Sequence, residues 1–364
     1  MPGAGVAEPA ALRWLGVAVA ALVLLAALLG NLLVLAVVCR FRRMRSPTNV
    51  LLASLATADI AVALLVMPPR LAYDLVRAWR LGLLACRLWI SCDVMCCTAS
   101  ILHLLAVALD RFWAITRPLR YRVSRRRLAL AVAAIWLCSA AISFVPVLLG
   151  WHADGSAPDA SDCGLRVNAV YALVSSLTSF YLPLPVMLYV YLRILLVAGR
   201  QARQIRLLER SLAGPSPGLR RSLRRRSKQL LHDTKAVRSL GIVLGVFCAC
   251  WLPFFLMYLI TACCPACDLG YEWSCAITWL GYSNSAFNPC IYAFLNRDFR
   301  AAFQELLGCG SRRRTADAML GPARRRSLIK PPPSCAHAVA TAVSTTARVA
   351  SMDCTKDSSE AERR

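Results

Sequence analysis

The sequence predicts an all-α membrane protein: a bundle of seven transmembrane helices with a short amphipathic eighth helix and a disordered tail. Composition is the first observation, because 58% of the 364 residues are hydrophobic and 17% are charged, with a mean hydropathy of +0.54. Soluble globular domains are markedly more polar. The second observation is that seven stretches are long enough to cross the membrane as helices, which takes about 20 mainly apolar residues each.

The predicted spans are Trp14–Cys39, Asn49–Tyr73, Ala85–Ile115, Leu128–Leu149, Val167–Val197, Ala236–Cys263 and Glu272–Leu295. A cleaved signal peptide is the alternative interpretation of the first span, but the apolar run is too long and lacks a small-residue cleavage site. We therefore divide the chain into an extracellular N-terminus (1–13), a seven-helix domain (14–295), a juxtamembrane helix (296–309) and a cytoplasmic tail (310–364).

The 43 Lys and Arg residues give a formal net charge of +24 and gather in short connections between the apolar stretches. The richest connections follow the first, third and fifth spans, at Arg40–Arg45, Arg117–Arg127 and Arg221–Lys228. Basic residues accumulate on the cytoplasmic side of membrane proteins, which predicts an outer N-terminus and a cytoplasmic C-terminus in a multi-pass plasma-membrane protein. Because these residues do not form one amphipathic surface, we expect no nucleic-acid partner.

The segment after the seventh span, Arg297–Leu307, alternates apolar residues at helical spacing with Arg300 and Glu305. This pattern indicates an amphipathic helix that lies on membrane lipid. From Gly310 onward the chain is rich in Pro, Ser, Thr, Ala and Arg, which is typical of a disordered tail.

Three residues are candidates for modification. Cys309, just beyond the amphipathic helix, is a candidate for palmitoylation, and an unmodified thiol is the alternative. Ser227 and Ser327 each follow three arginines and are candidate phosphorylation sites. The 17 cysteines lie mostly inside apolar segments without clustering, so we predict no metal site.

Six polar motifs occur in order along the spans. They are Gly30-Asn31, Leu55-Ala56-Thr57-Ala58-Asp59, Asp110-Arg111-Phe112, Trp136, Trp251-Leu252-Pro253 and Asn288-Pro289-Cys290-Ile291-Tyr292. Together they resemble the rhodopsin-like (class A) family of G-protein-coupled receptors, although Phe112 replaces the commoner Tyr. The resemblance implies a receptor that activates a heterotrimeric G protein, with arrestin and receptor kinases as further partners. It implies no enzymatic activity and no catalytic residues.

Several interior polar residues lie at similar depth on different spans: Asn31, Asp59, Ser100, Asn284, Ser285 and Asn288. A bundle would satisfy them against one another, water or an ion, because lone polar groups are costly at membrane depth. The resemblance implies that this polar network holds an allosteric sodium ion, and a water-filled network without an ion is the alternative. We expect no other cofactor.

Two prolines mark expected hinges in the sixth and seventh spans. Pro253 and Pro289 each remove an intrahelical hydrogen bond, so the cytoplasmic half of each span can swing about the outer half. By resemblance, Arg111, Tyr191 and Tyr292 rearrange on activation to admit the C-terminal helix of a G protein α-subunit.

Adjacent charges close the third span at its cytoplasmic end, where Asp110 precedes Arg111. Asp233, at the start of the sixth span, is the acid expected to reach Arg111 from the neighbouring helix. Such a pair would form a two-state element that ligand binding biases. A plain surface ion pair is the alternative.

The resemblance also implies a disulfide between Cys86, at the head of the third span, and Cys163 in the second outer loop. An oxidising extracellular compartment permits such a bond. The third outer loop contains Cys263, Cys264 and Cys267, and we expect Cys267 to pair with one of the other two.

Asp93 is an acid within an otherwise apolar span, where a charge costs at least about 2.5 kcal/mol unless it faces a cavity or a partner. It follows Cys86 by about two helical turns and therefore shares its face. The position resembles the amine-anchoring aspartate of the biogenic amine receptors. An ammonium ion would form a charge-assisted hydrogen bond with it.

The rest of the expected ligand site follows from this resemblance: Cys97, Trp251, Phe254, Phe255, Trp279 and Tyr282. On the fifth span, Ser175 and Ser179 share a helix face, with Ser176 beside them, so they can bind the two hydroxyls of a catechol. Bonding of these serines back to the helix carbonyls is the alternative.

The stretches Ile142–Val147, Trp151-His152 and Arg203–Arg210 are most similar to the type-1 dopamine receptor group. A short connection between the fifth and sixth spans favours a stimulatory G protein and adenylyl cyclase. Dopamine or another catecholamine is the expected ligand, and histamine (type-2-like), serotonin and octopamine receptors are the alternatives. An amine or proton transporter is the non-receptor alternative, but we see no internal repeat.

Overall fold

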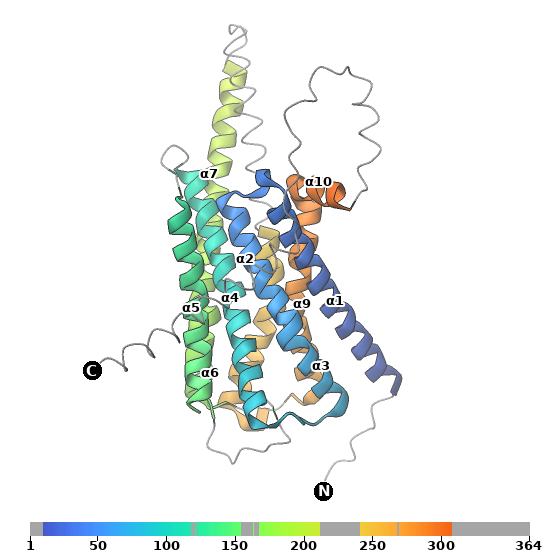
Figure 1. Ribbon diagram of the computed structural model, residues 1–364. Coiled ribbons are helices and arrows are strands. Elements are labelled where there is room, and N and C mark those ends of the chain that lie inside the picture. Colours follow the sequence, from blue (N-terminus) through green and yellow to red (C-terminus); the bar gives the residue numbers. More distant parts are fainter. Residues whose placement is uncertain are drawn as a thin grey trace, which may run out of the picture.

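The computed structural model describes residues 10–117, 121, 123–153, 163, 167–211, 241–267 and 269–307. All regular structure in these ranges is helical, in a bundle whose helices run roughly side by side (Figure 1). The residues Cys309, Ser227, Ser327 and Asp233, the extreme N-terminus and the tail, for which predictions were made above, lie outside the described residues.

The helices match the predicted spans to within a few residues, except that α7 continues to Ser211, well beyond the predicted end of the fifth span at Val197. The first, third and fourth spans are α1 (Ala10–Arg40), α4 (Gly82–Thr116) and α5 (Arg125–Leu148). The second consists of α2 (Pro47–Ala61) and α3 (Met67–Val76), and the fifth of α6 (Ala169–Ser176) and α7 (Pro183–Ser211). The helix Gly241–Cys263, α9 (Tyr271–Leu295) and α10 (Arg297–Leu306) complete the set, with short 3₁₀ turns at Arg42–Met44 and Pro265–Cys267.

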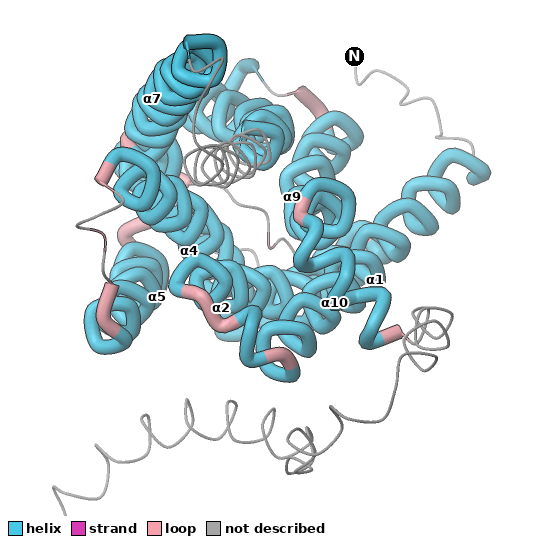
Figure 2. The backbone as a smooth tube through the Cα atoms, turned by 90° about the horizontal axis from the view of Figure 1, so that it is seen from above, coloured by secondary structure: helices cyan, strands magenta, loops and turns pink. Residues whose placement is uncertain are grey.

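Six described helices are long and apolar enough to cross a membrane: Arg13–Arg40, Pro47–Val76, Gly82–Thr116, Arg125–Leu148, Ala169–Val197 and Gly241–Cys263. The seventh predicted span, α9, has 25 residues, but it is not among these six helices, because no long stretch of it is sufficiently apolar. Its polar residues Ser283, Asn284, Ser285 and Asn288 are buried, so they face the bundle rather than lipid. α9 packs against α1 and α2 (Figure 2).

The second and fifth spans each contain a single π-helical turn close to a proline. Val62–Val66 precedes Pro68, and Leu177–Tyr181 precedes Pro183. Proline has no backbone N–H to donate to the preceding turn, and its ring displaces the carbonyl there. The helix therefore widens locally. In the fifth span, the amide of Leu182 donates to the carbonyl of Leu177 at 2.9 Å. These turns change the direction of the side chains near the outer end of the bundle.

The amphipathic helix predicted after the seventh span is α10. The side chain of Asn296 caps it by accepting from the amides of Asp298 and Phe299. Part of its apolar face packs against the bundle, where Phe299, Ala302 and Phe303 are buried. Leu306 and Leu307, at the end of the helix, are exposed and leave apolar surface for contact with membrane lipid.

Gly30 allows α1 to approach α9 at the proline of the seventh span. A Cβ atom at Gly30 would lie 2.8 Å from the Cγ atom of Pro289 and 2.9 Å from its Cβ atom. Such distances are shorter than van der Waals contact, so a larger residue must push the two helices apart. Gly16, elsewhere in α1, has no atom within 4 Å of the same position.

We therefore predict that Gly30→Ala destabilises the folded protein by about 1–3 kcal/mol, the usual cost of overpacking a core. Thermal unfolding of the detergent-solubilised protein would show this as a lower Tm. Gly16→Ala is the matched control and should leave the Tm unchanged or slightly raised, because alanine favours helix. Equal Tm values for the two variants would contradict the close contact.

Candidate functional site

An outer cavity of 50 Å³ lies between α4, the fifth span, the helix Gly241–Cys263 and α9. It is lined by Asp93, Val94, Cys97, Thr98, Ile101, Ser175, Ser179, Trp251, Phe254, Phe255, Tyr258 and Tyr282. Residues from four spans thus surround one small space. Eight of the ten predicted ligand residues line it, and the exceptions are Ser176 and Trp279.

The carboxylate of Asp93 is held by two neutral donors. The hydroxyl of Tyr282 donates to Oδ2 at 2.8 Å, and the thiol of Cys97 donates to Oδ1 at 3.3 Å. No described Lys or Arg forms an ion pair with Asp93. The acid therefore presents its charge to the cavity, where a cation can form a strong, charge-assisted hydrogen bond.

The three serines of the fifth span differ in their surroundings. Ser175 donates to the backbone carbonyl of Tyr171 at 2.7 Å, while Ser179 shares a hydrogen bond of 2.9 Å with Thr98. Ser176 is 0% exposed, has no hydrogen-bond partner in the structure and does not line the cavity. Two of the three hydroxyls are therefore placed to meet a ligand.

Aromatic rings close the cavity from the sixth span. Phe255 stacks on Phe180 with ring centroids 4.5 Å apart, and Phe254 stacks on Tyr258 at 5.8 Å. Sequence reasoning missed Tyr258, although it follows Phe254 by four residues and so shares its helix face. Trp279 lies behind the cavity wall, where its indole nitrogen donates to Asp74 at 2.8 Å.

The predicted polar network is centred on Asp59, which is 0% exposed. Its Oδ1 atom accepts from Ser285 at 2.8 Å and Ser100 at 3.1 Å, and its Oδ2 atom accepts from Asn288 at 2.9 Å. Asn31 and Asn284 are also buried, and Asn31 donates to the carbonyl of Ser285 at 2.9 Å.

The donor set around Asp59 suits a hard monovalent cation. One carboxylate and the hydroxyls of Ser100 and Ser285 supply oxygen ligands, which such ions prefer. No described basic residue pairs with Asp59. The arrangement would let the serine hydroxyls turn from the carboxylate toward an ion.

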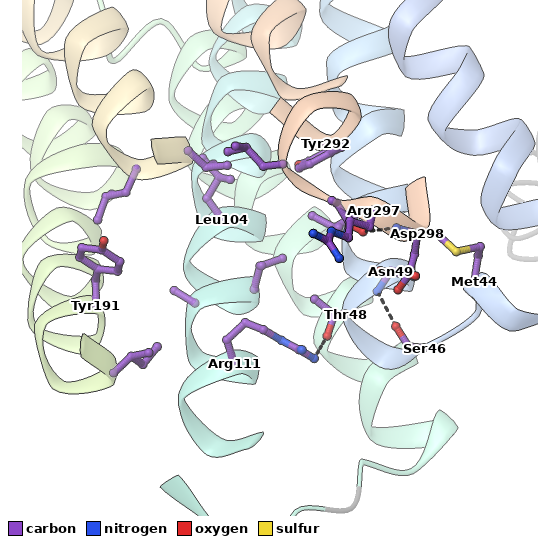
Figure 3. Close-up of a pocket in the computed structure, with 18 of the residues that line it drawn as sticks. Met44, Ser46, Thr48, Asn49, Leu104, Arg111, Tyr191, Tyr292, Arg297 and Asp298 are labelled. Carbon is purple, nitrogen blue, oxygen red and sulfur yellow. Dashed lines mark hydrogen bonds between the residues drawn. The ribbon is translucent and has the colours of Figure 1, made fainter. Parts of the chain in front are cut away.

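A second and larger cavity, of 490 Å³, opens at the end of the bundle that the sequence predicts to be cytoplasmic, and we call it the cytoplasmic cavity. Figure 3 shows Arg111, Tyr191 and Tyr292 on its walls, with Arg297 and Asp298 of α10 at one side. Three of the predicted switch residues therefore line one space. Its mixture of apolar walls and arginines can receive a partner helix.

Asp110 connects three segments at this cytoplasmic cavity. Its carboxylate accepts from Thr48 of α2 at 2.5 Å, from Arg111 at 2.8 Å and from the hydroxyl of Tyr121. Arg111 also donates to Thr48, as Figure 3 shows. The guanidinium is thus directed toward α2. Sequence reasoning missed both Thr48 and Tyr121 as partners.

Both outer-loop disulfides are present. Cys86 and Cys163 are joined, with their Cα atoms 5.8 Å apart, which attaches the second outer loop to the head of α4. In the third outer loop Cys264 pairs with Cys267, and Cys263 remains a free, exposed thiol. This resolves the choice of partner for Cys267.

Comparison with known proteins agrees with this geometry. The profile of the 7 transmembrane receptor (rhodopsin family) matches residues 30–292. The chain is 41% identical over 300 residues to a "D(5)-like dopamine receptor" of Takifugu rubripes, covering 78% of this chain and 64% of the relative. It is 40% identical over 324 residues to a "D(1)-like dopamine receptor" of Oreochromis mossambicus, covering 84% and 81%.

An "Octopamine receptor beta-2R" of Chilo suppressalis is 37% identical over 312 residues, which cover 79% of this chain and 78% of the relative. The chain spans less than two thirds of the length of the D(5)-like relative. The family profile nevertheless covers the six motifs, the outer cavity, the polar network and the cytoplasmic cavity apart from its lining residues from Leu295 onward. The chain belongs to the rhodopsin family of seven-transmembrane receptors.

Proposed function

We propose that the chain is a plasma-membrane receptor that binds a biogenic amine, with dopamine or another catecholamine as its ligand. The observation that carries this proposal is the Asp93 carboxylate, which faces the outer cavity with only neutral donors around it. A protonated amine supplies the missing charge, and the surrounding aromatic rings favour a flat ring beside it. The relatives named as dopamine receptors support the same ligand class.

Octopamine is the second candidate ligand, and a specific observation favours it. Ser176 lies outside the cavity, and Ser175 donates its proton to the carbonyl of Tyr171. Ser179 bonds to another hydroxyl, that of Thr98, in which either group can be the donor, so Ser179 is the serine that can still donate its proton to a ligand. One such contact suffices for a ring that carries a single hydroxyl. A relative named as an octopamine receptor is consistent with this candidate.

The cytoplasmic cavity supports the second half of the proposal, coupling to a stimulatory G protein with the N-terminus outside the cell. Its volume of 490 Å³ and its lining by Arg111, Tyr191 and Tyr292 suit the end of a G protein helix. Arrestin and receptor kinases would use the same cytoplasmic face. The polar network around Asp59 would hold a sodium ion in the resting receptor.

Replacing the anchor tests the ligand class. Asp93→Asn removes the charge but keeps the shape, so the potency of dopamine in a cyclic-AMP assay should fall about 100-fold, since a buried charge pair is worth 2–5 kcal/mol. Glu272→Gln, which removes an exposed acid outside the cavity, is the control and should respond normally. Full amine potency in Asp93→Asn at equal surface expression would refute the proposed binding site.

The serines can be separated by single substitutions. Ser179→Ala should lower dopamine potency about tenfold, the effect of one lost hydrogen bond to a ligand. Ser176→Ala is the matched control from the same helix and should change potency little, because that side chain does not line the cavity. Testing octopamine, serotonin and histamine on the same variants ranks the ligands. A larger loss from Ser176→Ala than from Ser179→Ala would contradict this placement.

Removing a partner of Asp110 tests the cytoplasmic switch. Thr48→Val keeps the shape but deletes a hydrogen bond to a charged group, worth about 1.5–3 kcal/mol. Arg111 should then leave α2 more readily, and ligand-independent cyclic-AMP production should rise about tenfold. Thr57→Val is the control, because that exposed hydroxyl bonds only to its own helix. Unchanged basal signalling in Thr48→Val would show that these contacts do not hold the resting state.

A further inference from the structure

The outer ends of α3 and α9 carry a cluster that neither cavity uses. Four side chains form it, and we call this group the outer clasp: Arg70, Asp74, Tyr271 and Trp279. The carboxylate of Asp74 pairs with the Arg70 guanidinium at 2.9 Å, and it also accepts from the Trp279 indole at 2.8 Å and from the Tyr271 hydroxyl. The Arg70 and Asp74 side chains are only 15% and 10% exposed.

Shielding from water makes these contacts stronger than ordinary surface pairs. An exposed ion pair contributes little to stability, whereas each hydrogen bond to a charged group in a water-poor site contributes considerably more. Asp74 brings together one donor on its own helix and two on α9. Its loss would leave Arg70 and the Trp279 indole without their acceptor at once.

The outer clasp is connected to the amine anchor by direct contacts. The Trp279 ring packs edge-to-face against Tyr282, with centroids 5.7 Å apart and an interplanar angle of 89°. Tyr282 in turn donates its hydroxyl to Asp93 at 2.8 Å. A continuous path thus runs from Asp74 through Trp279 and Tyr282 to the carboxylate that faces the cavity.

Each step in this path fixes an orientation. The bond to Asp74 sets the rotation of the indole, because the indole nitrogen is its one donor. The edge-to-face contact then restricts the Tyr282 ring, and the Tyr282 hydroxyl restricts the Asp93 carboxylate. A charge-assisted bond loses strength when its geometry is poor, so the orientation of the carboxylate matters for cation binding.

We propose that Asp74 is a positioning residue for amine recognition: it holds Trp279, and through Tyr282 it orients the Asp93 carboxylate toward the ligand. This inference rests on the proposed function, since it concerns the same amine site. It assigns the outer clasp a role in affinity although Asp74 does not touch the cavity.

The test is equilibrium binding of radiolabelled dopamine to membranes that carry the full chain. Asp74→Asn and Trp279→Phe should each weaken dopamine binding about tenfold. A loss of this size lies within the usual range of interaction energies between contacting residues. Tyr282→Phe should weaken it similarly. The double variant Asp74→Asn/Tyr282→Phe should lose no more than about twofold beyond Tyr282→Phe alone, because both changes interrupt one path.

The variants also separate positioning from charge. Asp74→Asn leaves Arg70 uncompensated above the site and could repel an ammonium ion, but Trp279→Phe keeps all charges while it removes the indole N–H together with the five-membered ring that carries it. The positioning role would be overturned if Asp74→Asn weakened dopamine binding and Trp279→Phe did not. It would also be overturned if the affinity losses of Asp74→Asn and Tyr282→Phe multiplied fully in the double variant. A purely structural role would lower surface expression, which antibody labelling of an epitope tag measures, without the non-additivity.

Glu272→Gln is the matched control at the same end of α9. It breaks the exposed pair of Glu272 with Arg77, whose guanidinium also lies over the Tyr271 ring, but it removes no donor to Asp74. Its dopamine affinity should equal that of the parent protein. Asp93→Asn distinguishes failure of the proposed function from failure of the positioning role. Undiminished dopamine binding in Asp93→Asn would refute the proposed function. If Asp93→Asn abolished binding while the losses from Asp74→Asn and Tyr282→Phe multiplied, only the positioning role would be refuted.

Discussion

The structure depends on how a membrane bundle accommodates buried carboxylates. An acid at membrane depth costs several kcal/mol unless other groups solvate it, so each one forces polar side chains on neighbouring helices to converge. Asp59 shows this most clearly, because α2 supplies the acid while α4 and α9 supply the donors Ser100, Ser285 and Asn288. The packing of three spans is thereby fixed at one depth. The less apolar character of α9 follows from the same requirement.

Backbone irregularities decide what faces the cavities. The π turn Leu177–Tyr181 contains Ser179 and follows Ser175 and Ser176. The turn ends next to Pro183, which cannot donate a regular helical hydrogen bond. The helix is therefore widened at the point where the fifth span approaches Thr98 of α4. A proline can thus shape the ligand cavity, in addition to allowing a helix to bend. Gly30 has the complementary role, since its missing side chain makes room for Pro289 between α1 and α9.

Sequence reasoning located the spans and placed Asp93 near Tyr282, because hydropathy and helical spacing carry that information directly. It could not predict that Ser176 does not line the cavity, since three neighbouring serines look equivalent until the direction of each side chain is known. The sequence also could not predict the position of Trp279. An indole near an amine site is expected to line the cavity, but the indole nitrogen of Trp279 donates to Asp74 instead. The same holds for Asp110, because its partner Thr48 is 62 residues away in the sequence and its partner Tyr121 lies in the connection after α4, outside any predicted span.

The interior acids fall into two chemical kinds. Asp74 and Asp110, near opposite ends of the bundle, each pair with an arginine at 2.9 Å and 2.8 Å. Asp59 and Asp93 lie deeper and are met only by neutral hydroxyl, amide and thiol donors among the described residues. Neutral donors solvate a carboxylate but do not cancel its charge, so these two positions retain an attraction for a mobile cation. An organic ammonium fits the aromatic surroundings of Asp93, and a small inorganic ion fits the hydroxyl-lined surroundings of Asp59.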